Sequence, residues 1–302
     1  MDSGEFTPLL GSTDWNEEWK ELQKLRRRAD DSAFWDKRSA TFTTKDAPSP
    51  YVEQFLTYAD IRPGETVFDM GCGTGALALP LGAAGHKVVA ADFSQGMLDQ
   101  MQARLDETGI RTVFPKLMSW EDDWASFGVR EGMTDVALAS RSIATADLRD
   151  SLLRLTEVVR RRVCITLATG SSPRVDERIL AAVGLPSVLG RDYLYAFNIL
   201  AGEGIKAEVR YISSTREDTF TAPEDAYDKL AAMIDDSSAV QATGPERERA
   251  RANLREWITA NLVPNEHAGE PDCKGVAQGA WRLAEARTVT WAFLAWNTDG
   301  TV

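Results

Sequence analysis

Residues 67–75 read VFDMGCGTG, and this stretch decides the fold of the chain. A short apolar run contains the acid Asp69, and glycines follow at every second position (Gly71, Gly73 and Gly75). The apolar run is typical of a buried parallel strand, and residues 76–81 favour the start of a helix. Glycine has no Cβ, so the backbone between them can turn sharply and come close to a ligand. Because open α/β sheets bind ligands at this carboxyl edge, we expect a nucleotide-like ligand here.

A second acid supports this interpretation. Residues 87–92 read KVVAAD, which predicts another buried strand that ends in Asp92, 17 residues after Gly75. A carboxylate at the tip of the second strand can accept both ribose hydroxyls, and a βαβ unit places it about 20 residues after the glycine turn. The two features together predict a nucleoside-containing ligand, and the alternative is a tight structural turn.

The spacing of the glycines bears on which nucleoside is bound. Dinucleotide folds use Gly-x-Gly-x-x-Gly, with a helix N-terminus that faces a pyrophosphate. Here the spacing is Gly-x-Gly-x-Gly, and Asp69 stands two residues before the first glycine. A carboxylate repels a pyrophosphate and attracts an ammonium group. A dinucleotide-dependent oxidoreductase is therefore disfavoured.

The motif Asp69-x-Gly71-x-Gly73-x-Gly75 resembles the first motif of the class I S-adenosylmethionine-dependent methyltransferases. The resemblance covers roughly residues 50 to 170 and a plausible last strand near the C-terminus. It implies S-adenosyl-L-methionine as the methyl donor. It also implies a doubly wound α/β fold with seven strands, mostly parallel and with an antiparallel last strand, plus an N-terminal helical lid and an inserted helical region.

Strand and helix patterns alternate along the chain, as a doubly wound sheet requires. We expect a single methyltransferase domain in four parts, which are a helical lid (1–48), a cofactor-binding core (49–170), inserted helices of the acceptor region (171–204) and C-terminal strands and helices that complete the sheet (205–302). Predicted helices include residues 14–25, 32–42, 50–60, 94–109, 146–161, 175–183, 193–201 and 245–262. Predicted strands after the first two are residues 111–117, 134–139, 163–168, 206–212 and 288–296.

Composition narrows the class of protein. The chain has 302 residues, of which 43% are hydrophobic and 26% charged, as expected for a soluble globular protein without a membrane span. Three scattered cysteines and an acidic N-terminus favour a cytoplasmic, reduced setting. The net charge of −12 argues against a nucleic-acid partner, and the basic runs 24–28 and 160–162 are interpreted as solvated helix faces rather than an RNA-facing patch. The sequence leaves the oligomeric state open.

The resemblance assigns roles to residues around the expected cofactor. Asp69 would orient the methionine ammonium, and Asp92 would accept the ribose hydroxyls. The glycine turn, which includes Cys72, would approach the methionine portion. Two residues would flank the adenine (Phe93 and Met97), and two are candidates for contact with its edge (Trp120 and Glu121). Ser140, at the end of the fourth strand, is also expected beside the cofactor. Met97 could instead pack in the core of its helix, and Trp120 could instead anchor its loop.

The acceptor side offers fewer signals. Candidates for a catalytic role are Arg141, Tyr193 and Tyr195. Arg141 could bind an acceptor carboxylate in bidentate fashion, or the segment 140–142 could be a simple strand-to-helix turn. His86 precedes the second strand, at the amino edge of the sheet and away from the site, whereas His267 lies in a polar loop that could reach anywhere. We do not expect a histidine base, and no cluster of histidines and acids suggests a metal.

These observations predict methyl transfer by in-line displacement to a small-molecule acceptor. A sulfonium leaving group needs no protonation, so alignment of the reactants can supply much of the rate. The aromatic residues Tyr193, Tyr195 and Phe197 favour an apolar or planar acceptor. The alternatives are a protein or RNA acceptor and a non-catalytic protein that binds S-adenosylmethionine. Whether O, N, C or S is methylated stays open.

Overall fold

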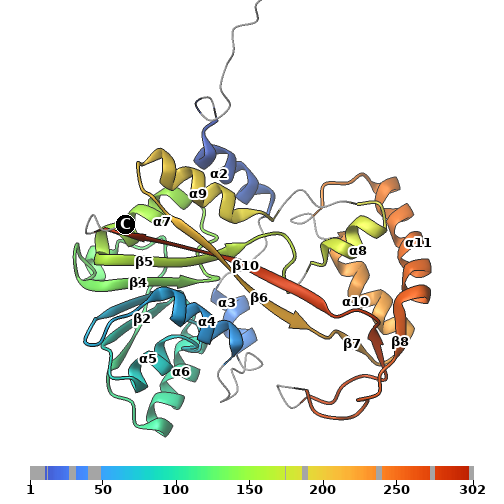
Figure 1. The fold of residues 1–302 in the computed structure, drawn as a ribbon, viewed down its shortest axis with the longest axis horizontal. Helices are drawn as coiled ribbons and strands as arrows, with labels where there is room; N and C mark the ends of the chain where they lie inside the picture. The colour runs from blue at the N-terminus through green and yellow to red at the C-terminus, as the bar shows by residue number, and fades with distance from the viewer. Residues whose placement is uncertain are drawn as a thin grey trace, which may run out of the picture.

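A seven-stranded sheet in the order β3-β2-β1-β4-β5-β10-β6 forms the centre of the protein (Figure 1). The computed structural model describes residues 11, 13–26, 32–39, 49–173, 175–185, 190–235, 240–272 and 276–298. The strands are β1 (Val67–Met70), β2 (Val88–Asp92), β3 (Val113–Leu117), β4 (Thr134–Ser140), β5 (Val159–Ala168), β6 (Glu208–Arg216) and β10 (Arg287–Asn297). β10 runs antiparallel to both β5 and β6, and the pairs among β1 to β5 are parallel. The predicted mostly parallel sheet with an antiparallel last strand is confirmed.

Helices cover both faces of this sheet (Figure 1). One face carries α4 (Pro50–Ala59), α5 (Ala78–Ala83) and α6 (Gln95–Thr108), whose apolar side chains form one core cluster with the strands. The other carries α7 (Leu148–Val158) and α9 (Asp192–Gly202), with α2 (Trp15–Leu25) packed outside them. All four residues of β1 are buried, as a central parallel strand between two helical layers requires.

Local signals set several helix ends where the sequence predicted them. Ser94 precedes α6 and its side chain accepts a hydrogen bond from the Met97 N–H, while Gly109 ends the helix in the left-handed conformation. Asp14 caps α2 by accepting from the backbone N–H groups of Asn16 and Glu17. Each cap satisfies donors that the first turn of a helix leaves without partners.

A second group of elements, here called the C-terminal lobe, lies beyond the carboxyl ends of β4 and β5 (Figure 1). It consists of α8 (Glu177–Ala182), α10 (Pro223–Asp235), α11 (Gly244–Asn261) and a three-stranded sheet of β7 (Thr219–Phe220), β9 (Trp281–Leu283) and β8 (Leu262–Pro264). These elements share their own hydrophobic cluster. The sequence did not predict the small sheet, because strands of two or three residues carry no alternating pattern.

The two helices expected within 171–204 take different places. α8 packs on α11 in the C-terminal lobe, whereas α9 packs against β5, α7 and α2. Of the described residues from 205 onward, only β6 and β10 join the large sheet. No helix in the described ranges is long and apolar enough to cross a membrane.

The interpretation of residues 160–162 as a solvated helix end was wrong. α7 ends at Val158 and these arginines lie in β5. Arg161 is only 7% exposed and bonds to the Glu65 carboxylate and to the Asp60 carbonyl. Arg162 is similarly buried and pairs with Glu208. Carboxylates from distant segments make the burial of these charges possible, and a local pattern cannot show them. Of the other basic run, residues 27 and 28 lie outside the described residues, as do 1–10 and 40–48 of the predicted lid.

Candidate functional site

The turn after β1 uses its three glycines for different reasons. All three have positive φ, +75° at Gly71, +55° at Gly73 and +85° at Gly75. A Cβ at Gly71 would lie 2.2 Å from the Ser142 Cβ, and one at Gly75 would lie 2.8 Å from the Met101 Sδ. A Cβ at Gly73 would meet no atom within 4 Å. The first and third glycines therefore permit packing inside the protein, and the second opens onto free space that a ligand could fill.

Asp92 connects this turn to the end of β2. Its Oδ2 accepts a hydrogen bond of 2.8 Å from the Gly73 N–H, and its Oδ1 accepts one of 2.9 Å from the Ser94 N–H. Burial raises the pKa of the Asp92 carboxyl, although the backbone hydrogen bonds oppose the shift. Each carboxylate oxygen has two lone pairs, so the group keeps acceptor capacity for hydroxyls of a ligand.

Asp69 is the more isolated acid. Its side chain is 1% exposed, and its Oδ2 has no hydrogen-bond partner among the residues that the structure describes. Burial, followed by the charge of Asp92, raises the pKa of Asp69 to about 7. An unpartnered buried acceptor costs about 1–3 kcal/mol, and more when it is charged. A cationic donor such as an ammonium group would supply both the missing hydrogen bond and the missing charge. The residues present therefore fit the expected cofactor.

The other turn residue, Cys72, is part of the scaffold. Its N–H shares the Ala91 carbonyl with the Gly71 N–H, at 3.0 and 2.7 Å. Its side chain is buried, and burial raises the pKa of the thiol. These bonds hold the turn against the carboxyl end of β2.

Helix α3 (Ser32–Ser39) packs on α6 beside the two expected adenine neighbours. Asp36 Oδ1 accepts from the Ser94 Oγ at 2.6 Å and from the Gly96 N–H at 3.0 Å. Met97, one turn into α6, is buried, and Phe93 is half-buried. Asp36 was missed because its bond to Ser94 spans 58 residues and leaves no local signal.

The loop after β3 holds the two residues proposed for the adenine edge. Trp120 packs on Trp124 with ring centroids 5.6 Å apart, and its Nε1 has no partner in the described part of the chain. Glu121 is exposed and bonds to the Ser119 hydroxyl. Arg154 of α7 donates to the Trp120 carbonyl. The loop is thus anchored to α7, and the Trp120 N–H is a buried donor without a partner in this part of the structure.

The end of β4 is held by hydroxyl groups from neighbouring elements. Tyr51 of α4 places its hydroxyl 2.8 Å from the Ser140 Oγ and 2.7 Å from the Thr166 Oγ1. The Arg141 N–H donates to the same Thr166 Oγ1 at 3.0 Å. Ser142 Oγ donates to the Met70 carbonyl at 2.7 Å, which joins this segment to β1. These bonds fix a left-handed backbone at Arg141, with φ of +58°, a conformation that costs a non-glycine residue about 1–2 kcal/mol.

The Arg141 side chain lies on an aromatic surface. Its Cζ is 4.4 Å from the ring centroid of Tyr51 and 5.8 Å from that of Trp291, distances typical of cation–π contacts. The side chain is exposed, and no carboxylate lies within ion-pair distance of it among the residues described. Sequence reasoning missed Tyr51 and Trp291 as site residues, because an aromatic residue in a helix or strand is most often core.

The two tyrosine candidates lie elsewhere. Tyr193 meets Tyr211 of β6 edge to face, with centroids 6.1 Å apart. Tyr195 donates to Glu18 Oε1 at 2.7 Å, and burial together with this bond raises its pKa to about 12. Both tyrosines pack on the core cluster of the α7 face, whereas Tyr51 under Arg141 belongs to the cluster of the α4 face. The structure does not bring the tyrosines together with Arg141.

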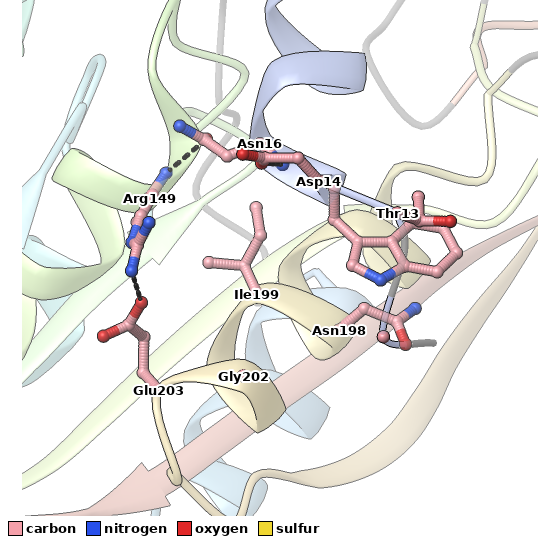
Figure 2. Close-up of a pocket in the computed structure, with 10 residues that line it drawn as sticks. Thr13, Asp14, Asn16, Arg149, Asn198, Ile199, Gly202 and Glu203 are labelled. Carbon is pink, nitrogen blue, oxygen red and sulfur yellow. Dashed lines mark hydrogen bonds and ion pairs between the residues drawn. The ribbon is translucent and has the colours of Figure 1, made fainter. Parts of the chain in front are cut away.

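A shallow pocket of about 360 Å³ lies between α2 and α9 (Figure 2). At its edge the Asn16 Oδ1 accepts from the Arg149 N–H, and Arg149 pairs with Glu203. Its lining contains none of the predicted site residues. In the described ranges, no three His, Cys, Asp or Glu side chains are grouped as metal ligands would be.

Comparisons with known proteins show which proteins this chain resembles. A family model described as a methyltransferase domain matches residues 67–162. An uncharacterized protein of Haemophilus influenzae is 28% identical over 267 residues, which are 88% of this chain and 89% of that protein. Nocamycin O-methyltransferase of Saccharothrix syringae is 34% identical over 98 residues, about a third of each chain.

Among solved structures, magnesium protoporphyrin IX methyltransferase of Synechocystis with bound S-adenosylhomocysteine is 18% identical, with a TM-score of 0.45 over 65% of this chain and 94% of that one. The matched domain spans β1 to the first part of β5, which includes the glycine turn and both acids. Residues 67–162 therefore match a methyltransferase domain, in agreement with the resemblance of the glycine motif to the class I S-adenosylmethionine-dependent methyltransferases.

Proposed function

We propose that this protein transfers the methyl group of S-adenosylmethionine to a small-molecule acceptor. The observation that carries the proposal is the buried, unpartnered Asp69 Oδ2 beside Asp92, at the open side of the Gly73 backbone. A ligand with an ammonium group and a ribose satisfies both carboxylates at once. Few other cofactors combine these two groups.

The remaining cofactor contacts follow from the same placement. Asp69 would hold the ammonium group and Asp92 the ribose hydroxyls, while the Gly73 backbone would lie against the methionine portion. The half-buried Phe93 and the buried Met97 would flank the adenine. The free Trp120 N–H, with Glu121 beside it, could bond to the adenine edge. Ser140 stands at the end of β4, where the donor and acceptor sides meet.

S-adenosylmethionine held by these residues would supply a methyl group on a sulfonium, a leaving group that needs no proton. The chain positions the reactants rather than protonating a leaving group. Alignment and exclusion of water can supply about 7–11 kcal/mol of such a barrier. The bonds of Asp36 to the start of α6 hold α3 beside the cofactor side, where it can shield the site from water.

Two observations favour a small molecule over a macromolecule. The net charge of −12 opposes binding of RNA, whose recognition depends on contacts with phosphates. Nocamycin O-methyltransferase, which shares 34% identity over 98 residues, is named for a small-molecule acceptor. A protein acceptor would be an alternative outcome of the activity test below.

Calorimetric titration tests the cofactor site. We expect S-adenosylmethionine and S-adenosylhomocysteine to bind, and NAD not to bind. Asp69→Ala and Asp92→Ala should each lower affinity for S-adenosylhomocysteine at least about tenfold, the equivalent of one charge-assisted hydrogen bond. Asp99→Ala, on the exposed side of α6, is the matched control and should leave affinity unchanged. Wild-type protein that binds neither sulfur nucleoside would contradict the proposal.

Transfer of labelled methyl from S-adenosylmethionine tests the acceptor class. The protein is incubated with a cell extract that has been separated by ultrafiltration into small molecules and macromolecules. Label should enter the small-molecule fraction and depend on Asp69. Label in protein or RNA would overturn the small-molecule assignment, and cofactor binding without any transfer would indicate a non-catalytic protein.

A further inference from the structure

We infer that the methyl acceptor carries a carboxylate and that Arg141 is the residue that binds it. The inference rests on the proposed function and specifies its acceptor. Three observations carry it, namely the direction in which Arg141 extends, its unpaired charge and the way its backbone is held.

The guanidinium extends away from the donor side of the sheet. In the strand order β1-β4-β5-β10, Arg141 follows β4 and the glycine turn follows β1. Trp291, which lies under the guanidinium, belongs to β10 and is paired with Ala168 of β5. Since neighbouring strands lie about 4.8 Å apart, β10 is roughly 10 Å from β4 on the side opposite β1. The positive charge therefore lies beyond the methyl donor, on the side that an acceptor must occupy.

The charge of Arg141 is free for a ligand. Several other arginines of the sheet bond to carboxylates, as Arg161 does to Glu65 and Arg287 to Asp218. Arg141 has no such partner among the described residues, although acids outnumber bases in this chain by 46 to 34. Stacking of the guanidinium on rings leaves its N–H edges open, and these edges match a carboxylate in bidentate fashion.

The backbone of Arg141 is set before any acceptor binds. Its left-handed φ is held from one side by Thr166 and Tyr51 and from the other by the bond of Ser142 to Met70. Strained backbone persists where the surroundings determine it, and such positions cluster at ligand sites. A simple strand-to-helix turn would be served better by glycine or asparagine at this position.

The test is calorimetric titration of the complex with S-adenosylhomocysteine. The probes are benzoate, phenylacetate and cinnamate, each paired with its neutral amide, and inorganic phosphate. Wild-type protein should bind at least one carboxylate about tenfold more tightly than its amide, and phosphate more weakly. Arg141→Gln should remove this preference, since one charge-assisted bidentate pair corresponds to about that factor. Arg141→Lys should restore part of it.

Arg210→Gln is the matched control. Arg210 also stacks on a tyrosine, with its Cζ 5.0 Å from the Tyr58 centroid, but it is paired with Glu208. This variant should keep the wild-type preference for the carboxylate. Affinity for S-adenosylhomocysteine should stay within about twofold of wild type in all Arg141 variants, because the guanidinium lies beyond the donor.

Several results would overturn the inference. These are equal binding of acids and amides, no binding of any carboxylate, tighter binding of phosphate, or a preference that survives Arg141→Gln. A fifth is loss of S-adenosylhomocysteine affinity in Arg141→Gln with unchanged affinity for 5′-methylthioadenosine, which lacks the amino-acid end. That result would mean that Arg141 holds the donor carboxylate. Absence of S-adenosylhomocysteine binding to wild-type protein would instead contradict the proposed function itself.

Discussion

At the residue scale, two aspartates that lie beside the same glycine turn have different surroundings. Asp92 accepts two backbone N–H bonds, whereas Asp69 Oδ2 accepts none from the described residues. Burial is the largest cause of the raised pKa in both, and the charge of Asp92 adds to that of Asp69. Asp69 therefore destabilises the unliganded fold when it is ionised, and a cationic ligand relieves this.

The pH dependence of stability should reveal this cost. The folded pKa of Asp69, about 7, is raised above that of an unfolded chain, so its favourable contribution is present at low pH and lost as pH rises through 7. Asp69→Asn should therefore stabilise the unliganded protein at pH 8, by a few kcal/mol at about 1.36 kcal/mol per pKa unit, and progressively less as pH falls. Thermal denaturation at pH 5 and 8 measures the effect, with Asp99→Asn as control. A lower melting temperature for Asp69→Asn at pH 8 would disprove it.

The same ionisation should govern cofactor binding. Affinity for S-adenosylhomocysteine should rise with pH through about 7, because only the ionised Asp69 attracts the ammonium group. 5′-Methylthioadenosine has no ammonium group and should show a much flatter profile. Calorimetry from pH 5.5 to 8.5 compares the two, and parallel profiles would place the ammonium group away from Asp69.

The glycines of the turn provide a matched pair of substitutions. Gly71→Ala drives a Cβ to 2.2 Å from the Ser142 Cβ and should destabilise the fold by about 1–3 kcal/mol or more, as overpacking does. Gly73→Ala meets open space and bears mainly the backbone strain, about 1–2 kcal/mol. Urea denaturation should rank Gly71→Ala as the less stable variant. In folded Gly73→Ala, S-adenosylhomocysteine affinity should fall, because the new methyl group enters the cofactor space. Unchanged affinity would mean that the cofactor lies elsewhere.

At the element scale, α3 depends on α6 for its position. Asp36 bonds to the Ser94 hydroxyl and to the Gly96 N–H, and hydrogen bonding to these groups lowers the pKa of its carboxyl. A Cβ at Gly96 would lie 2.7 Å from the Ser39 Oγ, so the two helices are in close contact. One side chain thus links a predicted lid helix to the helix that follows Asp92.

Removing that link should free α3 while the core stays folded. Asp36→Ala should increase amide exchange in residues 32–39 and leave β1 and β4 protected, because its lost bonds join only α3 and α6. Lys37→Ala, on the same helix and also exposed, is the control. Hydrogen-exchange mass spectrometry measures both variants with and without S-adenosylhomocysteine. Equal protection of α3 in Asp36→Ala and wild type would refute the linking role.

At the scale of the whole molecule, two hydrophobic regions share one chain. The large sheet is packed between its two helical layers, and the C-terminal lobe has a separate cluster. Arg287 at the start of β10 joins them, because its buried guanidinium bonds to the Ser172 carbonyl and to Asp218. The lobe is thus attached at the ends of β6 and β10, beyond the strands that hold the cofactor residues.

A core substitution in the lobe should leave cofactor binding intact. Leu254 of α11 is fully buried, so Leu254→Ala should cost about 2–5 kcal/mol within the lobe and raise amide exchange in α8, α10 and α11. Affinity for S-adenosylhomocysteine should stay unchanged. Leu138→Ala, equally buried beside β1, should lower both stability and affinity. A loss of affinity in Leu254→Ala comparable to that in Leu138→Ala would show that the two regions do not behave separately.

Most of the sheet could be predicted because its signals are local. Buried parallel strands are short apolar runs, and α6 is capped by Ser94 at its start and by Gly109 at its end. Predictions failed where a buried arginine is neutralised by a carboxylate that is distant in the sequence. Arg161 and Arg162 interrupt an apolar strand and were interpreted as a helix end, because nothing near them indicates Glu65 and Glu208.

The sequence by itself determined the fold class and indicated the methyl donor, since both depend on a continuous stretch in which spacing and residue type suffice. The acceptor side was decided only by tertiary structure. The role proposed for Arg141 depends on its contacts with Tyr51 of α4 and Trp291 of β10, which lie 90 residues before it and 150 after it. Such a site exists only in the folded sheet, because the cation–π contacts and the held left-handed backbone require neighbours from distant parts of the sequence.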